Sequence, residues 1–232
     1  MALYTISDLH LPLGVDKPMD IFGKNWENYV QRLYDNWQDC VKDDDTVVLP
    51  GDFSWATYLE DAKKDFEFLQ SLNGRKILLK GNHDYWWETM SKLKKYASEN
   101  NYNSVYFLQN NSFEYKNTFI CGTRGWNLPV SPHTGEEDNK IYQREVQRLE
   151  LSLSSAKKEA DKIVFTHFPP IGNDCIQNDF TDMLKKYGVK KCVYGHLHAK
   201  SAKNGLTGEI DSVNYLLVSC DYMEFKPLKL LD

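Results

Sequence analysis

Histidine, aspartate and asparagine recur at the ends of strand-like runs in this chain, and their side chains could bind metal ions and transfer protons. Residues 75–80 form an apolar run typical of a buried strand, and Gly81 then allows a sharp turn. Asn82, His83 and Asp84 follow, with an amide oxygen, an imidazole and a carboxylate. Open α/β sheets place their sites at such strand ends. Alone, the segment could also be a polar turn, since Gly, Asn and Asp are turn residues.

The same design occurs four more times along the chain. Each time, an apolar run of four or five residues is followed within a few positions by Asp or His. The runs are residues 3–6, 46–49, 162–166 and 191–194, and they lead to Asp8, His10, Asp52, His167, His196 and His198. Five such ends in order are hard to explain as turns, so we expect them to converge at one edge of a sheet. The remaining histidine, His133, is interpreted as structural.

The elements that must position these groups follow from apolar spacing. Strands and helices alternate in the first hundred residues, which indicates a parallel sheet with right-handed crossovers. Short runs between residues 105 and 121 indicate an antiparallel portion. Residues 123–139 show no periodicity and predict a long loop, and loops of this length are usually functional or disordered. Helical spacing is found over residues 26–41, 59–69, 86–97, 142–153 and 180–187, and closing strands are expected over 213–218 and 225–231.

Composition narrows the class of protein. The 232 residues, 41% of them hydrophobic, are enough for one domain, which we expect to span residues 1–232. A net charge of −5 weighs against long nucleic acids and anionic membranes as partners. The five cysteines share no C-x-x-C spacing, and the first residues lack a signal-like apolar core, so we expect a reduced, cytoplasmic protein. The sequence does not predict the oligomeric state.

Taken in order, these motifs resemble the calcineurin-like metallophosphoesterase superfamily. D-x-H at residues 8–10, G-D at 51–52, G-N-H-D at 81–84, the single His167 and G-H-x-H at 195–198 are similar to its signature. The resemblance implies an α/β four-layer sandwich of two mixed β-sheets packed face to face and flanked by helices, with a dinuclear metal site at the strand ends. The chain lacks the G-D-x-x-D-R-G motif of the protein Ser/Thr phosphatases, so it is more similar to the small phosphohydrolases of the G-N-H-D and G-H-x-H branch.

The resemblance also implies a ligand set for two divalent ions. One ion would be held by Asp8, His10 and His198, the other by Asn82, His167 and His196, and Asp52 would bridge the two. Imidazole, carboxylate and amide ligands suit Mn, Fe, Ni, Co or Zn better than Mg or Ca. The absence of cysteine from the set argues against a closed structural zinc site.

The implied reaction is hydrolysis of a phosphomonoester or phosphodiester by a metal-bridging hydroxide. His83 would act as the general acid, with Asp84 orienting its ring. Arg124 either clamps a substrate phosphate or pairs with a surface acid, and the residues favour neither. A small phosphorylated substrate is expected, with specificity in residues 11–23, 53–58 and 123–139. Two alternatives are a nuclease using the same two-metal chemistry and a non-catalytic scaffold that uses the fold for binding.

Overall fold

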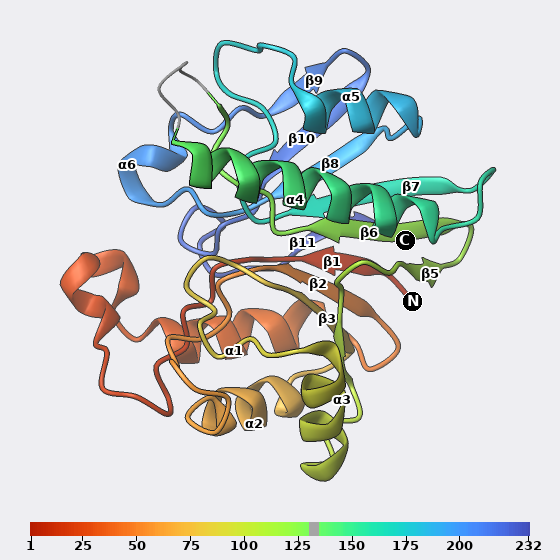
Figure 1. Ribbon diagram of the computed structural model, residues 1–232. Coiled ribbons are helices and arrows are strands. Elements are labelled where there is room, and N and C mark those ends of the chain that lie inside the picture. The colour runs from red at the N-terminus through yellow and green to blue at the C-terminus, as the bar shows by residue number, and fades with distance from the viewer. Residues whose placement is uncertain (130–134) are drawn as a thin grey trace.

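The computed structural model describes residues 1–129 and 135–232, and His133 lies outside the described residues. Two mixed β-sheets stack face to face between two layers of helices (Figure 1). In the first sheet β1 to β4 are parallel and β11 is antiparallel to β1. Its order is β11 (Leu228–Leu231), β1 (Leu3–Thr5), β2 (Thr46–Pro50), β3 (Arg75–Leu79) and β4 (Val105–Phe107).

The second sheet has a parallel centre and two antiparallel edges. Strands β6, β7, β8 and β10 run parallel, while β5 and β9 pair antiparallel with β6 and β10. Its order is β5 (Phe113–Tyr115), β6 (Thr118–Thr123), β7 (Asp161–Thr166), β8 (Lys191–Tyr194), β10 (Val213–Leu217) and β9 (Gly208–Ile210). The expected sandwich of two mixed sheets is therefore confirmed.

Helices cover the outer face of each sheet (Figure 1). Helices α1 (Tyr29–Cys40), α2 (Lys63–Ser71) and α3 (Met90–Glu99) lie on the first sheet, and α4 (Glu136–Ser154) and α5 (Asp179–Lys186) lie on the second. Two 3₁₀ turns, η1 (Met19–Phe22) and η2 (Lys24–Trp26), precede α1, and the short α6 (Ala199–Ala202) follows β8. None of the described helices combines the length and apolar character needed to cross a membrane.

Three apolar cores hold the layers together. Between the sheets, Leu3, Val48 and Ile77 of the first sheet share a core with Ile163 and Val193 of the second. One further core lies between the first sheet and α1 to α3, and another lies between the second sheet and α4 and α5. Central strands such as β2 are therefore buried on both faces, which is why they form continuous apolar runs in the sequence.

Some predicted boundaries were wrong. The first helix begins at Tyr29, since Trp26 belongs to a 3₁₀ turn. The third begins at Met90, because Trp86 is held in the turn before it by a hydrogen bond from its ring N–H to Asp84. The loop predicted for residues 123–139 ends earlier, where α4 starts at Glu136. Apolar spacing does not distinguish a buried turn from the helix it precedes.

Candidate metal centre

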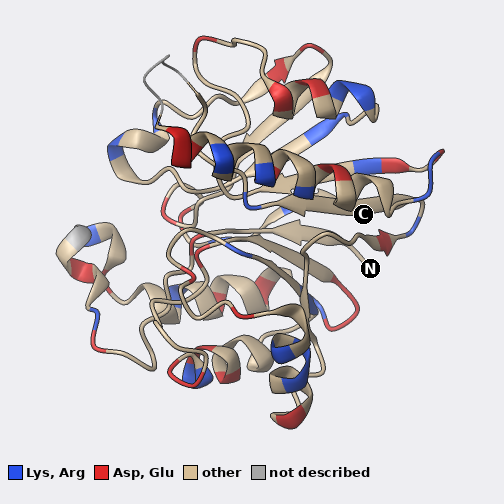
Figure 2. Cartoon of the chain, in the orientation of Figure 1, with Lys and Arg blue, Asp and Glu red and all other residues tan. Residues whose placement is uncertain are grey.

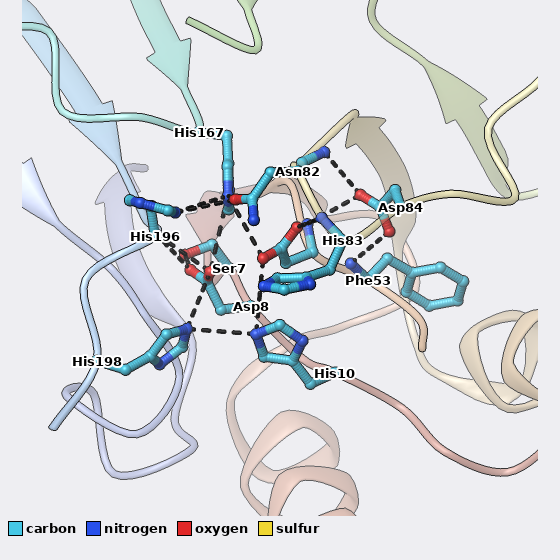
Figure 3. Close-up of polar contacts among 12 residues, drawn as sticks. Ser7, Asp8, His10, Phe53, Asn82, His83, Asp84, His167, His196 and His198 are labelled. Carbon is cyan, nitrogen blue, oxygen red and sulfur yellow. Dashed lines mark hydrogen bonds and ion pairs between the residues drawn. The ribbon is translucent and has the colours of Figure 1, made fainter. Parts of the chain in front are cut away.

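The two sheets meet at the site through the segments that follow their strands. Ser7, just after β1, forms a β-bridge with Ser219, just after β10. The N–H of Asp8 donates to the carbonyl of Gly51, which follows β2. The carboxyl ends of β1, β2, β3, β7 and β8 therefore lie at one edge. The predicted residues that gather there include Asp8, His10, Asn82, His83, His167, His196 and His198 (Figure 3).

The three residues of the first predicted ligand set lie close together. His198 Nε2 lies 3.2 Å from Asp8 Oδ1 and 3.3 Å from His10 Nε2. The donor atoms of these three residues lie within 4.8 Å of one another. Asp8 and His10 are buried, whereas 27% of the His198 side chain is exposed.

The second predicted set is equally close. Asn82 Oδ1 lies 2.7 Å from His167 Nε2 and 3.0 Å from His196 Nδ1, and these two ring nitrogens are 3.3 Å apart. Asp52 lies between the sets, with Oδ2 3.4 Å from His167 Nε2 and 3.7 Å from His10 Nε2. One carboxylate oxygen thus faces both groups of donors.

Hydrogen bonds on the far side of two rings show that the donor set fits cations. His167 Nδ1 lies 3.0 Å from the Pro50 carbonyl, which only accepts, so Nδ1 carries the proton. The lone pair of His167 Nε2 then faces the oxygens of Asn82 and Asp52. His198 Nδ1 likewise lies 2.7 Å from Asp221 Oδ1, which directs its Nε2 toward Asp8. Electron-pair donors that converge in this way suit divalent metal ions, and such outer hydrogen bonds are typical of metal-binding histidines.

The backbone at the site is strained. Asp8, His10, Asp52 and His196 have φ values of 60°, 46°, 52° and 71°, in the left-handed region that few residues other than glycine adopt. Such conformations each cost about 1–3 kcal/mol and cluster at functional sites. The fold therefore holds four of the seven predicted ligands in a conformation that their own preferences disfavour.

Glycines before the candidate ligands allow the close approach of these segments. A Cβ at Gly51 would lie 2.5 Å from His167 Nδ1. A Cβ at Gly81 would collide with the carboxylate of Asp52, and one at Gly195 with the carboxylate of Asp8. The glycine of each G-D, G-N-H-D and G-H-x-H motif is thus required by packing against the site itself.

Burial and neighbouring charges shift the acid–base properties of the site. Burial raises the pKa of Asp52 well above its usual range, and the Asp84 and Asp8 carboxylates add to that rise. Burial would also raise the pKa of Asp8, but His198, together with His167 and His10, outweighs it and the pKa is lowered. Asp8 accepts a further hydrogen bond from the Ser7 hydroxyl.

The pKa values of the histidines are also shifted in opposite directions. Burial lowers the pKa of His10 well below its usual range, lowers that of His167 to about 3 and lowers that of His196. Burial would also lower the pKa of His198, but Asp8 and Asp221 raise it to about 10.

Asp84 makes contacts that differ from the expectation that it orients the His83 ring. Its buried carboxylate accepts the N–H groups of Gly81, Asp52, Phe53 and Ser54 at 2.7–3.3 Å, together with the indole N–H noted above. None of the hydrogen bonds found among the described residues joins it to the His83 imidazole. Asp84 instead fixes the segment after β2 against the segment after β3.

His83 is tethered to the site through its backbone. Its N–H donates to Asp52 Oδ1 at 2.8 Å, and its ring lies 5.5 Å from the His10 ring and 4.6 Å from the Trp55 ring. Burial lowers the pKa of this half-buried imidazole. The ring therefore lies beside the candidate metal ligands, on the side that faces Trp55.

Arg124 is engaged in a structural contact. Its guanidinium lies 3.4 Å from Glu145 Oε1 and stacks over the Trp126 ring at 4.5 Å. Of the two predicted roles, the contacts favour pairing with an acid, although Glu145 is fully buried and is not a surface acid. The carbonyl of Arg124 also accepts the N–H of His167 and so helps to position that ring.

The sequence reasoning missed Asp221. Its carboxylate accepts His198 Nδ1–H at 2.7 Å and the N–H of Ala199 at 2.9 Å, so it holds both the ring and the turn that follows. Asp221 comes four residues after β10, which is the same signal as the five strand ends recognised in the sequence.

Comparison with known proteins identifies the family. The model of the calcineurin-like phosphoesterases matches residues 1–200. The chain belongs to the calcineurin-like phosphoesterase family. All seven candidate ligands lie within the matched residues.

Three relatives of this chain share only part of its sequence or its fold at low identity. The chain is 34% identical over 87 residues to an uncharacterised protein, MJ1445, of Methanocaldococcus jannaschii, and the match covers 37% of this chain and 48% of that protein. A protein of unknown function from Aquifex aeolicus, AQ665, has the same fold, with a TM-score of 0.52 and 19% identity over 98% of this chain and 95% of its own. Phosphopantetheinyl hydrolase from Mycobacterium tuberculosis gives a TM-score of 0.57 and 13% identity over 99% and 95%.

Proposed function

We propose that this chain hydrolyses small phosphoesters with two divalent ions bound at the candidate metal centre. Asp8, His10 and His198 would hold one ion, Asn82, His167 and His196 the other, and Asp52 both. The observation that carries the proposal is the convergence of donor atoms, in which the outer hydrogen bonds of His167 and His198 direct the Nε2 atoms of both rings toward carboxylate oxygens. The ligands come from both sheets, so we also propose that residues 1–232 work as one catalytic domain.

Besides holding the ions, the chain's own residues would have two roles in the reaction. Bound ions would supply positive charge against the phosphoryl oxygens and a nucleophile from water at neutral pH. The His83 imidazole would give a proton to the leaving oxygen, which spares the formation of a free alkoxide. An anionic phosphate beside this ring would raise its pKa again and so favour the protonated form. Asp84 would keep the His83 and Asp52 segments in register through its backbone contacts.

A small substrate agrees with the charge distribution. Helix α4 on the second sheet carries three acidic residues in its first turn and Glu150 nearer its end, with Lys140, Arg144 and Arg148 between them (Figure 2). Binding to long nucleic acids depends on many phosphate contacts from Lys and Arg, which this mixed surface does not favour. The hydrolase among the structural neighbours is named for phosphopantetheinyl groups, which agrees with a small phosphoester as the substrate class.

Turnover by metal-free and reconstituted protein tests the proposal. p-Nitrophenyl phosphate and bis(p-nitrophenyl) phosphate would be assayed with Mn²⁺, Ni²⁺, Co²⁺ and Zn²⁺, and the metal content measured in parallel. We expect turnover that needs a metal ion, disappears with a chelator and returns on reloading. Two bound ions without turnover of any phosphoester would instead indicate the non-catalytic scaffold, and retention on DNA that weakens with salt would indicate the nuclease.

A further inference from the structure

A cavity of about 220 Å³ lies beside the metal centre, against the His10 and His198 rings. Its remaining walls are His83 and four apolar residues, namely Met19, Trp26, Trp55 and Ala199. Met19 and Trp26 belong to the 3₁₀ turns after β1, and Trp55 follows β2. Chain segments that are distant in sequence thus build a largely apolar wall next to the candidate catalytic histidine.

The wall is preformed by packing. The Trp55 ring stacks on His10 with centroids 4.6 Å apart and an angle of 21°, and its indole N–H points to Met19 Sδ at 2.9 Å. Trp26 packs edge-on against Tyr29 and Phe225, at 5.1 and 5.2 Å. Met19 and Trp26 are each only 5% exposed. A ligand would therefore meet a shaped apolar surface without having to order it first.

Apart from its three imidazoles, this cavity offers few groups for polar recognition. The indole N–H of Trp55 is already directed at a sulfur atom, and Met19 and Ala199 have no side-chain hydrogen-bond donor. Lys17 lies over the Trp55 ring, with Nζ 4.5 Å from the centroid. Binding here would come from buried apolar area, which favours an aromatic or alkyl group over a polyol.

We propose that this cavity binds the alcohol side of the phosphoester, and that this part of the substrate is aromatic or alkyl. The inference rests on the proposed function, because it places the leaving group at His83, the residue assigned to protonate it. The volume suits a single ring or a short alkyl chain, since it lies below the range of roughly 300–1,000 Å³ usual for larger ligands. The substrate class is thus a phosphoester of a small apolar alcohol.

A homologous series of alkyl phosphates tests this inference with little change in leaving-group chemistry. From ethyl to butyl phosphate, kcat/KM should rise about two- to fourfold for each added methylene, and 2-phenylethyl phosphate should equal or exceed butyl phosphate. Glycerol phosphate, whose hydroxyls would be desolvated, should be turned over at least tenfold more slowly than butyl phosphate. A flat series, or a preference for glycerol phosphate, would overturn the inference.

Two variants test whether the dependence of kcat/KM on chain length arises in this cavity. Met19→Ser should flatten the series, because it replaces an apolar wall by a hydroxyl. Met183→Ser, a matched change in α5 against the core of the second sheet, should keep the full wild-type trend. A Met19→Ser enzyme with the full wild-type trend would contradict the assignment of this cavity.

The affinities of ligands that cannot be hydrolysed test this inference independently of the proposed function. Ethyl-, propyl- and butylphosphonate cannot be hydrolysed, and calorimetry on the metal-loaded protein would give their affinities. Affinity should rise with chain length whether or not any ester is turned over. Equal affinities would refute the cavity assignment even in an active enzyme, whereas rising affinities without turnover of any ester would retain the cavity and reject the proposed function.

Discussion

Replacing Asp221 with Asn should weaken the binding of one metal ion far more than that of the other. The buried carboxylate accepts one hydrogen bond from the His198 ring and one from the N–H of Ala199. An Asn side chain has one acceptor oxygen and one NH₂ group, so either orientation places a donor against a donor. The variant therefore loses one of the two bonds and removes the charge that polarises His198.

The size of the effect follows from the bond that is lost. A hydrogen bond to a charged group contributes about 1.5–3 kcal/mol, and about 1.4 kcal/mol corresponds to a tenfold change in affinity. We therefore expect the ion at Asp8, His10 and His198 to bind about 10- to 100-fold more weakly, as is usual when a partner of a metal-binding histidine is changed. The ion at Asn82, His167 and His196 should change much less.

Calorimetric titration of metal-free protein with Mn²⁺, in the presence of a competing chelator, measures both affinities. Asp211→Asn is the matched control, since Asp211 is exposed and contacts Gln177 Nε2 at 3.3 Å. It should keep the wild-type isotherm. Unchanged affinities in Asp221→Asn would refute the positioning role, and equal loss at both sites would refute the assignment of His198 to one ion.

Three further changes test other parts of the account. Asp52→Ala should leave less than two ions per chain by elemental analysis, because both ions lose a shared ligand, and two tightly bound ions would rule out bridging. His83→Ala should retain the metals but slow the hydrolysis of alkyl phosphates by roughly 10²–10⁴-fold, with a smaller loss on p-nitrophenyl phosphate, and equal losses would reject proton donation. Burial raises the pKa of Asp65 to about 7, although the hydrogen bonds from the Ser54 hydroxyl and the Leu13 N–H oppose the rise. Between about pH 4 and pH 7 the native state therefore binds a proton at Asp65 that the unfolded state has released. Wild-type stability should therefore fall from pH 4 to 7 relative to Asp65→Asn, by about 3–4 kcal/mol in denaturant unfolding, and parallel pH profiles would contradict this.

The sequence predicts the site best where a pattern of residues has a single physical explanation. Asp8, Asp52 and His167 each follow a continuous apolar run, and parallel strands place such ends at the same edge of a sheet. The convergence of these residues can therefore be predicted without the order of the strands. The packing of one sheet on the other was implied by family resemblance, because apolar runs alone do not say which strands share a sheet.

The sequence does not predict which distant segments contact one another. Asp84 was expected at the His83 ring, but its carboxylate instead binds backbone N–H groups of two turns that meet only in the folded chain. Trp26 was assigned to a helix face, whereas it lines the cavity beside His198. The spacing of residues within one segment does not determine which other segments it contacts.

Anomalous diffraction from crystals soaked in Mn²⁺ tests the central claim most directly. The account predicts two peaks about 3.5–4 Å apart, one beside Asp8, His10 and His198 and the other beside Asn82, His167 and His196, with Asp52 in contact with both. A single peak, or two peaks that do not share Asp52, would contradict it.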